Sequence, residues 1–142
     1  MVLIVEQDHL TEADEARLLA PLDQHAAGHG VKFSPESLVL TLRPDGPDSP
    51  VIGGLVGATN WTWLHIRILA VPAERRGLGI GRKLMDRAED IARLRGCRAA
   101  WVDTYSFQAP GFYERLGYRQ FGTLPDYPPG HQRLFYCKPL TG

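Results

Sequence analysis

The sequence contains few cysteines and no long hydrophobic run, and these absences exclude several classes of protein. Only Cys97 and Cys137 occur among 142 residues, and the five histidines are scattered. No metal-ligand spacing is present, so we predict no metal site. A disulfide remains open, but reduced, buried thiols are the expected state. No apolar stretch approaches the roughly 20 residues that cross a bilayer. We therefore expect a cytoplasmic globular protein with no membrane partner.

An excess of charge of one sign is also absent, although the charges are unevenly distributed. The formal net charge is zero, yet residues 1–66 hold nine acidic and three basic side chains, and residues 67–142 hold seven and thirteen. A nucleic-acid-binding domain usually carries a dominant positive field, so no nucleic-acid partner is predicted. Half of the basic residues lie at 75–98, which favours a phosphate-bearing small molecule. A solvated helix face would equally explain Arg87, Arg93 and Arg95.

The length suits one globular domain, and we predict a single α+β domain over residues 1–142. Thr11 is a good helix N-cap, and Gly96 and Gly117 are helix stops. Glycines at 53, 54 and 57 indicate bulges or close backbone approach. Periodicity and turn residues predict helices at 12–26, 79–95 and 109–116 and strands at 3–6, 37–43, 51–58, 61–71, 99–104, 118–123 and 132–138. This order predicts a mixed β-sheet with a strand–loop–helix–strand unit at its centre.

The most informative segment is the loop Arg76-Gly-Leu-Gly-Ile-Gly81, between a predicted strand and a predicted helix. Its three glycines remove side chains where backbone N–H groups must approach a ligand. The helix that follows presents unpaired N–H groups and the positive end of its dipole. Arg76 and Arg82 add positive charge, so the loop predicts an anion site suited to a pyrophosphate. A tight turn into a helix is the alternative, but that needs only one glycine.

The spacing of the glycines restricts which nucleotide the loop can hold. The dinucleotide pattern G-x-G-x-x-G fails, because Arg82 or Leu84 stands where the third glycine belongs, and no Gly-Lys-Ser/Thr of a P-loop occurs. The pattern R-x-x-G-x-G does match, as Arg76, Gly79 and Gly81. This spacing resembles the coenzyme A pyrophosphate loop of the GNAT family of N-acetyltransferases.

A second block resembles the same family. Residues 109–118 read A-P-G-F-Y-E-R-L-G-Y, which has the A-x-x-F-Y-x-x-x-G-[FY] form of the family's core. The block follows the loop across one helix and one strand, as it does in the family. The resemblance covers nearly the whole chain and is strongest over residues 63–121.

The resemblance implies a fold and a co-substrate. The GNAT fold has a mixed central β-sheet flanked by helices, and two strands of that sheet splay apart to bind acetyl-CoA. Backbone groups of the strand before the loop would hold the pantetheine arm, and the loop would hold the pyrophosphate. The expected cofactor-binding residues are Leu69, Ala70, Val71, Arg76, Gly77, Leu78, Gly79, Ile80, Gly81 and Arg82.

The resemblance also implies catalytic roles for matching positions. The backbone N–H of Leu69 is a candidate donor to the thioester carbonyl. Tyr113 matches the position whose hydroxyl faces the coenzyme sulfur and can protonate the leaving thiolate. A core aromatic role is the alternative for Tyr113. The family often has an asparagine where this chain has Ser106, which we expect to act at most as a supporting residue.

The residue available as catalytic base differs from the one common in the family, which is often a carboxylate on the strand before the loop. Here no acid lies between Asp48 and Glu74. Regular strand alternation would place His65, Arg67 and Leu69 on one face, which makes His65 the candidate base. A neighbouring Arg67 would lower the pKa of His65 and keep the imidazole neutral. A structural role for this histidine is the alternative.

The resemblance implies an acetyl-CoA-dependent N-acetyltransferase, in which a primary amine of a small molecule attacks the thioester directly in a ternary complex. Two alternatives remain open: a protein acetyltransferase acting on lysine or an N-terminal amine, and a non-catalytic acyl-CoA-binding regulatory module. Arg67 favours an acceptor that carries an anionic group beside its amine, unless it pairs with a distant acid such as Asp103. A homodimer is also left open.

Overall fold

The computed structural model describes residues 1–141, and its internal contacts divide the chain into two units, residues 1–34 and residues 35–142. In the first, the predicted helix is confirmed as α1 (Glu12–Gly28), and the Thr11 side chain caps it by accepting a hydrogen bond from the Asp14 N–H at 3.1 Å. The strand predicted at 3–6 is wrong, because this segment is exposed and pairs with no other strand.

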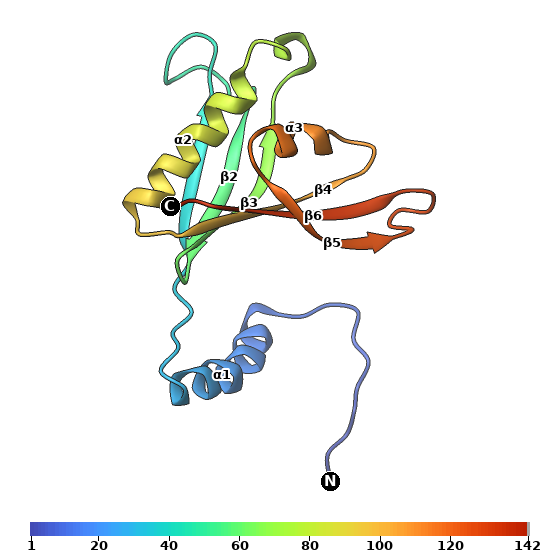
Figure 1. Ribbon diagram of the computed structural model, residues 1–142. Helices are drawn as coiled ribbons and strands as arrows, with labels where there is room; N and C mark the ends of the chain where they lie inside the picture. The colour runs from blue at the N-terminus through green and yellow to red at the C-terminus, as the bar shows by residue number, and fades with distance from the viewer. Residues whose placement is uncertain (142) are drawn as a thin grey trace. The chain divides into compact units, whose positions relative to one another are not determined.

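The second unit is built on a six-stranded mixed sheet, in the order β1-β2-β3-β4-β6-β5 (Figure 1). All neighbouring strands are antiparallel except β3 and β4, which are parallel. The mixed sheet predicted from the sequence is therefore confirmed. The strand bounds are β1 (Glu36–Leu42), β2 (Gly53–Asn60), β3 (Trp63–Ala70), β4 (Ala99–Tyr105), β5 (Arg119–Pro125) and β6 (Gln132–Pro139).

Helices cover one face of this sheet. The segment after β3 contains a short 3-10 helix η1 (Ala73–Arg75), followed by α2 (Ile80–Leu94), and α3 (Pro110–Arg115) connects β4 to β5. Residues of α2 and α3 share one core with alternate residues of the strands. The most deeply buried members of this core are Leu38, Leu55, Leu64, Ile66, Met85, Ala88, Ala92, Ala100, Val102, Tyr118 and Tyr136.

A buried carboxylate ties α2 to the last strands. Glu89 is only 2% exposed. It accepts hydrogen bonds from the Tyr118 hydroxyl at 2.9 Å and the Lys138 ammonium at 2.8 Å, and the Arg93 guanidinium lies 3.8 Å away. Because a buried charge is costly unless it is paired and hydrogen-bonded, these partners explain how the core tolerates it.

The glycines of β2 permit close strand approach, as the sequence predicts. A side chain on Gly57 would overlap the His65 carbonyl, and one on Gly54 would overlap the Leu40 carbonyl. The β2–β3 register also shifts here, because Gly57 pairs with Ile66 while Val56 pairs with Ile68. One extra residue of β3, at position 67, therefore has no partner in β2, as in a β-bulge.

The parallel strands β3 and β4 separate beyond the middle of the sheet. Their pairing runs from Trp63 with Ala99 to Ile66 with Val102 and then stops. Past that point β3 continues beside β2, and β4 continues beside β6 (Figure 1). The splayed strand pair expected of this fold is thus present.

Within residues 1–141, no helix is long and apolar enough to span a membrane. The same residues contain no cluster of three or more histidine, cysteine, aspartate or glutamate side chains able to hold a metal ion.

Candidate functional site

A cleft of about 840 Å³ lies where β3 and β4 separate. This volume is typical of small-molecule sites. The cleft brings together the two motifs found in the sequence, although they lie about 30 residues apart. Its lining residues are Leu69, Ala70, Val71, Arg75, Arg76, Gly77, Gly79, Ile80, Gly81, Arg82, Thr104, Phe107, Gln108, Ala109, Phe112, Tyr113 and Arg115. Of the predicted cofactor-binding residues, only Leu78 is missing from this lining, and its side chain is 66% exposed.

The glycine-rich loop has the backbone geometry that its sequence requires. Gly77 and Gly79 adopt φ angles of +79° and +76°, a region that other residues rarely occupy. Gly79 is the N-cap of α2 and provides no side-chain cap. At this end of the helix, the Lys83 N–H donates a hydrogen bond to the Gly79 carbonyl at 3.1 Å. The N–H groups of the preceding residues are therefore available to an anion at the positive end of the helix dipole.

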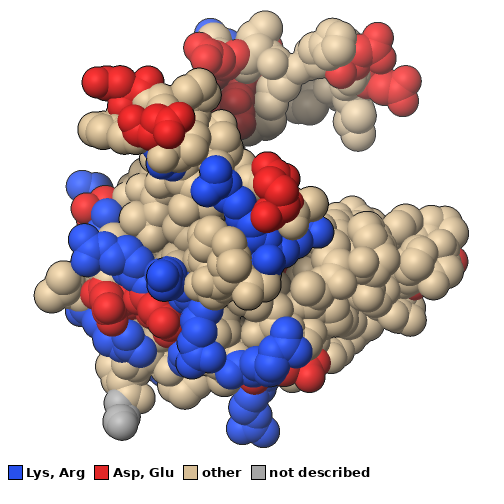
Figure 2. Space-filling model, turned by 90° about the horizontal axis from the view of Figure 1, so that it is seen from above, with Lys and Arg blue, Asp and Glu red and all other residues tan. Residues whose placement is uncertain are grey.

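Four arginines line the cleft, at positions 75, 76, 82 and 115. Arg76 donates to the Val71 carbonyl at 3.3 Å and so stays beside the loop. Arg82 lies 4.0 Å from Asp86, with both side chains largely exposed. Figure 2 looks down on the end of the molecule where α2 begins and shows lysine and arginine side chains gathered there. The basic block of the sequence thus contributes to a cleft suited to phosphate groups.

Two other arginines of the basic block have structural roles. Arg93 donates to the Leu140 carbonyl at 2.9 Å. Arg95 donates to the Ser37 carbonyl at 3.0 Å and to the Thr59 hydroxyl at 3.2 Å. These bonds fasten α2 to the last and first strands of the sheet. Part of the basic block therefore lines the cleft, and part of it supports the fold.

Tyr113 lies on α3 and lines the cleft, while 8% of the residue is exposed. Its ring packs among Phe112, Tyr118 and Tyr136, with centroids 5.1 to 6.4 Å away. Burial, and then the negative charge of Asp103, raises the pKa of Tyr113 to about 12. The phenol is therefore protonated at neutral pH and can donate a hydrogen bond into the cleft. The core aromatic role is therefore confirmed, whereas the role of the hydroxyl toward a leaving thiolate stays a prediction.

Leu69 and its neighbours form one wall of the cleft. Beyond Ile66 the edge of β3 that faces β4 has no strand partner. Backbone groups on this edge can therefore bind an extended ligand in the way that another strand would. The side chains of Leu69 and Val71 pack against the main core.

The predicted alternation along β3 is wrong past position 66. Regular alternation would place His65, Leu69 and Val71 on one face, but the β-bulge at Arg67 shifts the phase by one residue. Leu69 and Val71 therefore face the helices, as Ile66 does. His65 faces the other side of the sheet and is absent from the cleft lining.

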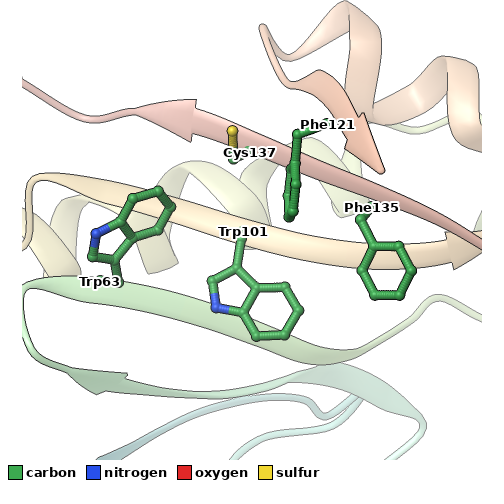
Figure 3. Close-up of a pocket in the computed structure, with 5 residues that line it drawn as sticks. All are labelled: Trp63, Trp101, Phe121, Phe135 and Cys137. Atoms are coloured by element: carbon green, nitrogen blue, oxygen red, sulfur yellow. The ribbon is translucent and has the colours of Figure 1, made fainter. Parts of the chain in front are cut away.

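On that opposite face, His65 stacks on Trp101 with ring centroids 3.7 Å apart and an interplanar angle of 5°. Figure 3 shows Trp101 beside Trp63, Phe121 and Phe135 on this aromatic surface. Burial lowers the pKa of His65, and the positive charges of Arg67 and Arg133 lower it further, against the opposing effect of Asp103. The lowered pKa favours the neutral imidazole. Its Nε2 is buried and has no hydrogen-bond partner in the described chain.

Arg67 does not pair with Asp103, the alternative that the sequence left open. Asp103 instead binds Arg133, whose Nε donates to it at 2.7 Å, and lies 3.8 Å from His65 Nε2. Arg67 is exposed, and no ion pair of its own is found within residues 1–141. A free guanidinium therefore lies at the bulge, next to the point where β3 and β4 separate.

Sequence reasoning missed several residues of the cleft. Thr104 ends the buried side of β4, and its hydroxyl donates to the Gln108 side-chain oxygen at 2.9 Å. The same Gln108 oxygen accepts the Tyr105 N–H at 3.0 Å, which fixes the turn after β4. Gln108 directly precedes the second motif, so its position was the available signal. Ser106 instead makes two hydrogen bonds with the backbone of Gln132. The Ser106 N–H donates to the Gln132 carbonyl at 2.8 Å, and the Ser106 hydroxyl accepts the Gln132 N–H at 2.9 Å, which joins this turn to β6.

Comparison with known proteins now identifies the class of this fold and cleft. The model of the acetyltransferase (GNAT) family matches residues 5–118, which is more than half of the chain. The chain therefore belongs to the acetyltransferase (GNAT) family. The resemblance, the fold class and the enzyme class predicted from the two motifs agree with this result.

Individual relatives are also named acetyltransferases. Over 86 residues the chain is 51% identical to blasticidin-S acetyltransferase from Streptomyces morookaense, and this match covers 60% of this chain and 63% of the relative. The match thus spans less than two thirds of that relative. A crystal structure of a candidate acetyltransferase from Agrobacterium tumefaciens superposes with a TM-score of 0.87 at 34% identity, covering 97% of this chain and 99% of the other.

A third comparison concerns the co-substrate. A candidate streptothricin acetyltransferase from Bacillus anthracis was solved in complex with acetyl coenzyme A. It superposes with a TM-score of 0.57 at 21% identity, and the match covers 66% of this chain and 58% of the other. At this identity the likeness concerns the fold alone.

Proposed function

We propose that this protein is an acetyl-CoA-dependent N-acetyltransferase that transfers an acetyl group to a primary amine of a small molecule. The observation that carries the proposal is the cleft at the strand separation. There the glycine loop, the unpaired edge of β3 and Tyr113 line one space. Family membership, with relatives named as acetyltransferases, supports the reaction class.

The cleft fits acetyl-CoA by its chemistry. The left-handed backbone at Gly77 and Gly79 and the start of α2 supply N–H groups for the pyrophosphate. Arg76 and Arg82 supply positive charge beside them. The free edge of β3 at 69–71 suits the pantetheine arm. The amide groups of this arm can form hydrogen bonds with the backbone of β3, as a neighbouring strand would. Acetyl-CoA, when bound, supplies the thioester that an amine can attack.

The transfer requires one bond to form and one to break. A bond forms between the amine nitrogen and the carbonyl carbon, and the carbon–sulfur bond breaks to release coenzyme A. The Leu69 N–H would donate to the carbonyl oxygen as negative charge develops there. The Tyr113 hydroxyl would donate to the departing sulfur. Because its pKa is about 12, well above the roughly 8.5 of an ordinary thiol, we expect hydrogen bonding to the thiolate to dominate over full proton transfer.

The proton that the amine loses needs a base. His65 is retained as the candidate, but only for an amine that approaches from the face opposite α2, because its ring lies there. Its lowered pKa leaves the imidazole free to accept a proton at neutral pH. Water is the alternative acceptor, since the buried Nε2 must become accessible before the histidine can act.

A small-molecule acceptor is favoured over a protein one. The relative that shares 51% identity is named for the small molecule blasticidin S. The free guanidinium of Arg67 beside the strand separation suits an acceptor with an anionic group near its amine. A protein lysine or N-terminal amine and a non-catalytic acyl-CoA-binding role remain the competing functions.

A panel of amines assayed for coenzyme A release tests this proposal. The panel should contain amino acids, polyamines, antibiotics that carry a primary amine, and lysine peptides, all at equal concentration. We expect release with small amines and amide formation by mass spectrometry. Acetyl-CoA binding without release from any amine would favour the regulatory module, and release only from peptides would favour the protein acetyltransferase.

A further inference from the structure

A cluster of aromatic rings lies beside the cleft on the face of the sheet opposite α2. Tyr105, at the end of β4, stacks with Phe107 at a centroid distance of 5.3 Å and an interplanar angle of 16°. Tyr105 and Tyr127 are almost parallel, at 8°, with centroids 6.4 Å apart. His131 meets the edge of the Phe107 ring at 5.1 Å. Four rings, from the end of β4, the turn after it and the loop between β5 and β6, thus gather at one place.

An ion pair holds this cluster in position. The Arg133 guanidinium lies 5.8 Å from the Tyr105 centroid and 5.9 Å from the Tyr127 centroid. Arg133 is in turn fixed by Asp103, which accepts a hydrogen bond from its Nε at 2.7 Å. Cation–π attraction and the ion pair therefore orient both tyrosines from one side. Arg133 acts on the cluster as a positioning residue.

The loop that carries Tyr127 is also held by backbone bonds. The Tyr127 N–H donates to the His131 carbonyl at 3.1 Å, and the Gly130 N–H donates to the Asp126 side chain at 2.9 Å. The Tyr127 side chain is nevertheless 48% exposed, and Phe107 is 55% exposed. Two large rings are thus pre-arranged while part of each remains open to solvent. Such rings bind ligands at a low cost in conformational entropy.

The cluster is continuous with the proposed reaction site. Phe107 belongs both to the cluster and to the cleft lining. Thr104 lines the cleft, and the next residue of the strand, Tyr105, points to the other face because side chains alternate. A molecule lying on the rings would therefore be next to the cleft at Phe107, where β3 and β4 no longer pair.

We infer that the aromatic cluster of Tyr105, Phe107 and Tyr127 selects acceptor amines that carry a flat, conjugated ring near the amine. This inference rests on the proposed acetyltransferase function and adds the acceptor class. Exposed, ordered aromatic rings attract another flat ring by offset stacking, beyond the burial of apolar area. A saturated ring of the same size gains the burial but not the stacking.

Two amines that differ only in this respect test the inference: 2-phenylethylamine and 2-cyclohexylethylamine. Simple hydrophobic burial favours the cyclohexyl compound, whereas stacking favours the phenyl compound. Aromatic pairs contribute about 0.5–1.5 kcal/mol beyond burial, so we expect a preference of about 2- to 13-fold for the phenyl amine. The preference is measured as Kd by calorimetry with coenzyme A present, and as kcat/KM by coenzyme A release.

Three variants of the full chain assign the preference to the cluster. Tyr127→Leu should reduce the ratio to near one, whereas Tyr127→Phe, which retains the ring, should preserve it. Phe121→Leu is the matched control, since it removes another exposed ring from the same face of the sheet (Figure 3) and should leave the ratio unchanged. Thermal unfolding of each variant verifies that it folds.

Several results would overturn the inference. These are equal affinity for the two amines in the wild type, no detectable binding of either at millimolar concentration, and an unchanged ratio in Tyr127→Leu. Failure of the proposed function is separable from these. A phenyl preference in calorimetry that Tyr127→Leu removes, without coenzyme A release from any amine, would support the binding surface and reject the transferase.

Discussion

The ring of Phe112 packs directly against Gly81, close to the position that a side chain at this residue would occupy. A Cβ built on Gly81 would approach two carbon atoms of the Phe112 ring at 3.2 and 3.3 Å, closer than ordinary van der Waals contact. Gly81 belongs to the first motif and Phe112 to the second, so this contact joins the two motifs across the cleft. Packing against the Phe112 ring favours glycine at position 81, whereas the left-handed backbone favours it at positions 77 and 79.

The first prediction follows from this contact. Gly81→Ala should displace Phe112, destabilise the fold by about 1–3 kcal/mol as an overpacked core does, and weaken acetyl-CoA binding. Denaturant unfolding and calorimetry measure the two effects. Gly28→Ala is the control, because no atom lies within 4 Å of an added Cβ there, and it should not destabilise. The double variant Gly81→Ala, Phe112→Leu should recover part of the stability. If Gly81→Ala behaves like Gly28→Ala, the contact has no energetic role.

The second prediction concerns the anion site. Gly79→Val should abolish acetyl-CoA binding, because it strains the φ of +76° at the start of α2 and blocks approach to the helix N–H groups. Gly130→Val is the matched control, with a φ of +83° in a loop outside the cleft. It should lose similar stability while keeping its acetyl-CoA affinity. A folded Gly79→Val protein with wild-type affinity by calorimetry would show that the loop assignment is wrong.

The third prediction concerns the departing sulfur. Tyr113→Phe should retain acetyl-CoA affinity and lower kcat by about 10²-fold, the usual contribution of a positioned proton or hydrogen-bond donor. Phe keeps the ring in its place among Phe112, Tyr118 and Tyr136, so stability should change little. Single-turnover kinetics measure the chemical step directly. A wild-type rate for that step would remove Tyr113 from the mechanism.

The fourth prediction is a pH dependence. The pKa of His65 is lowered in the folded protein, so the unfolded chain binds this proton more readily than the folded one. The contribution of this group to stability is therefore present above about pH 6.5, the ordinary value, and is lost as the pH falls below it. His65→Gln should flatten this part of the curve of unfolding free energy against pH.

The same group makes a second pH prediction, for activity. If His65 is the base, the acid limb of the profile of kcat/KM should lie below pH 6.5 and should be absent in His65→Gln. An acid limb that is identical in the variant would assign the base to water, while the stability measurement would still report the histidine's titration.

The fifth prediction concerns the acceptor. Arg67→Ala should lower kcat/KM for acceptors that carry a carboxylate near the amine and leave simple amines unchanged, because Arg67 is exposed and makes no ion pair within the described chain. Arg17→Ala, which removes an exposed arginine of α1, is the control. Equal loss for both acceptor types, or turnover of polyamines alone, would contradict this interpretation.

The sequence by itself determined most of the fold and most of the residues that line the cleft around the glycine-rich loop. Local patterns carried this information: glycine spacing in the loop, helical periodicity in α2, and the second block around Phe112. Such features depend on residues a few positions apart, which the chain places predictably whatever surrounds them. The loop residues at 76–82, except Leu78, therefore line the cleft as predicted.

The tertiary structure alone decided which residues lie beside the cleft on the opposite face of the sheet. The extra residue of β3 at Arg67 depends on how Gly57 and Val56 of β2 pair with β3, and it reversed the predicted face of Leu69 relative to His65. The pairing of Asp103 with Arg133 joins residues 30 positions apart. Strand register and long-range ion pairs arise from contacts between distant segments, which no local pattern encodes. For this reason the two motifs could predict the family, but only the folded sheet could show on which face His65, Leu69 and Asp103 lie.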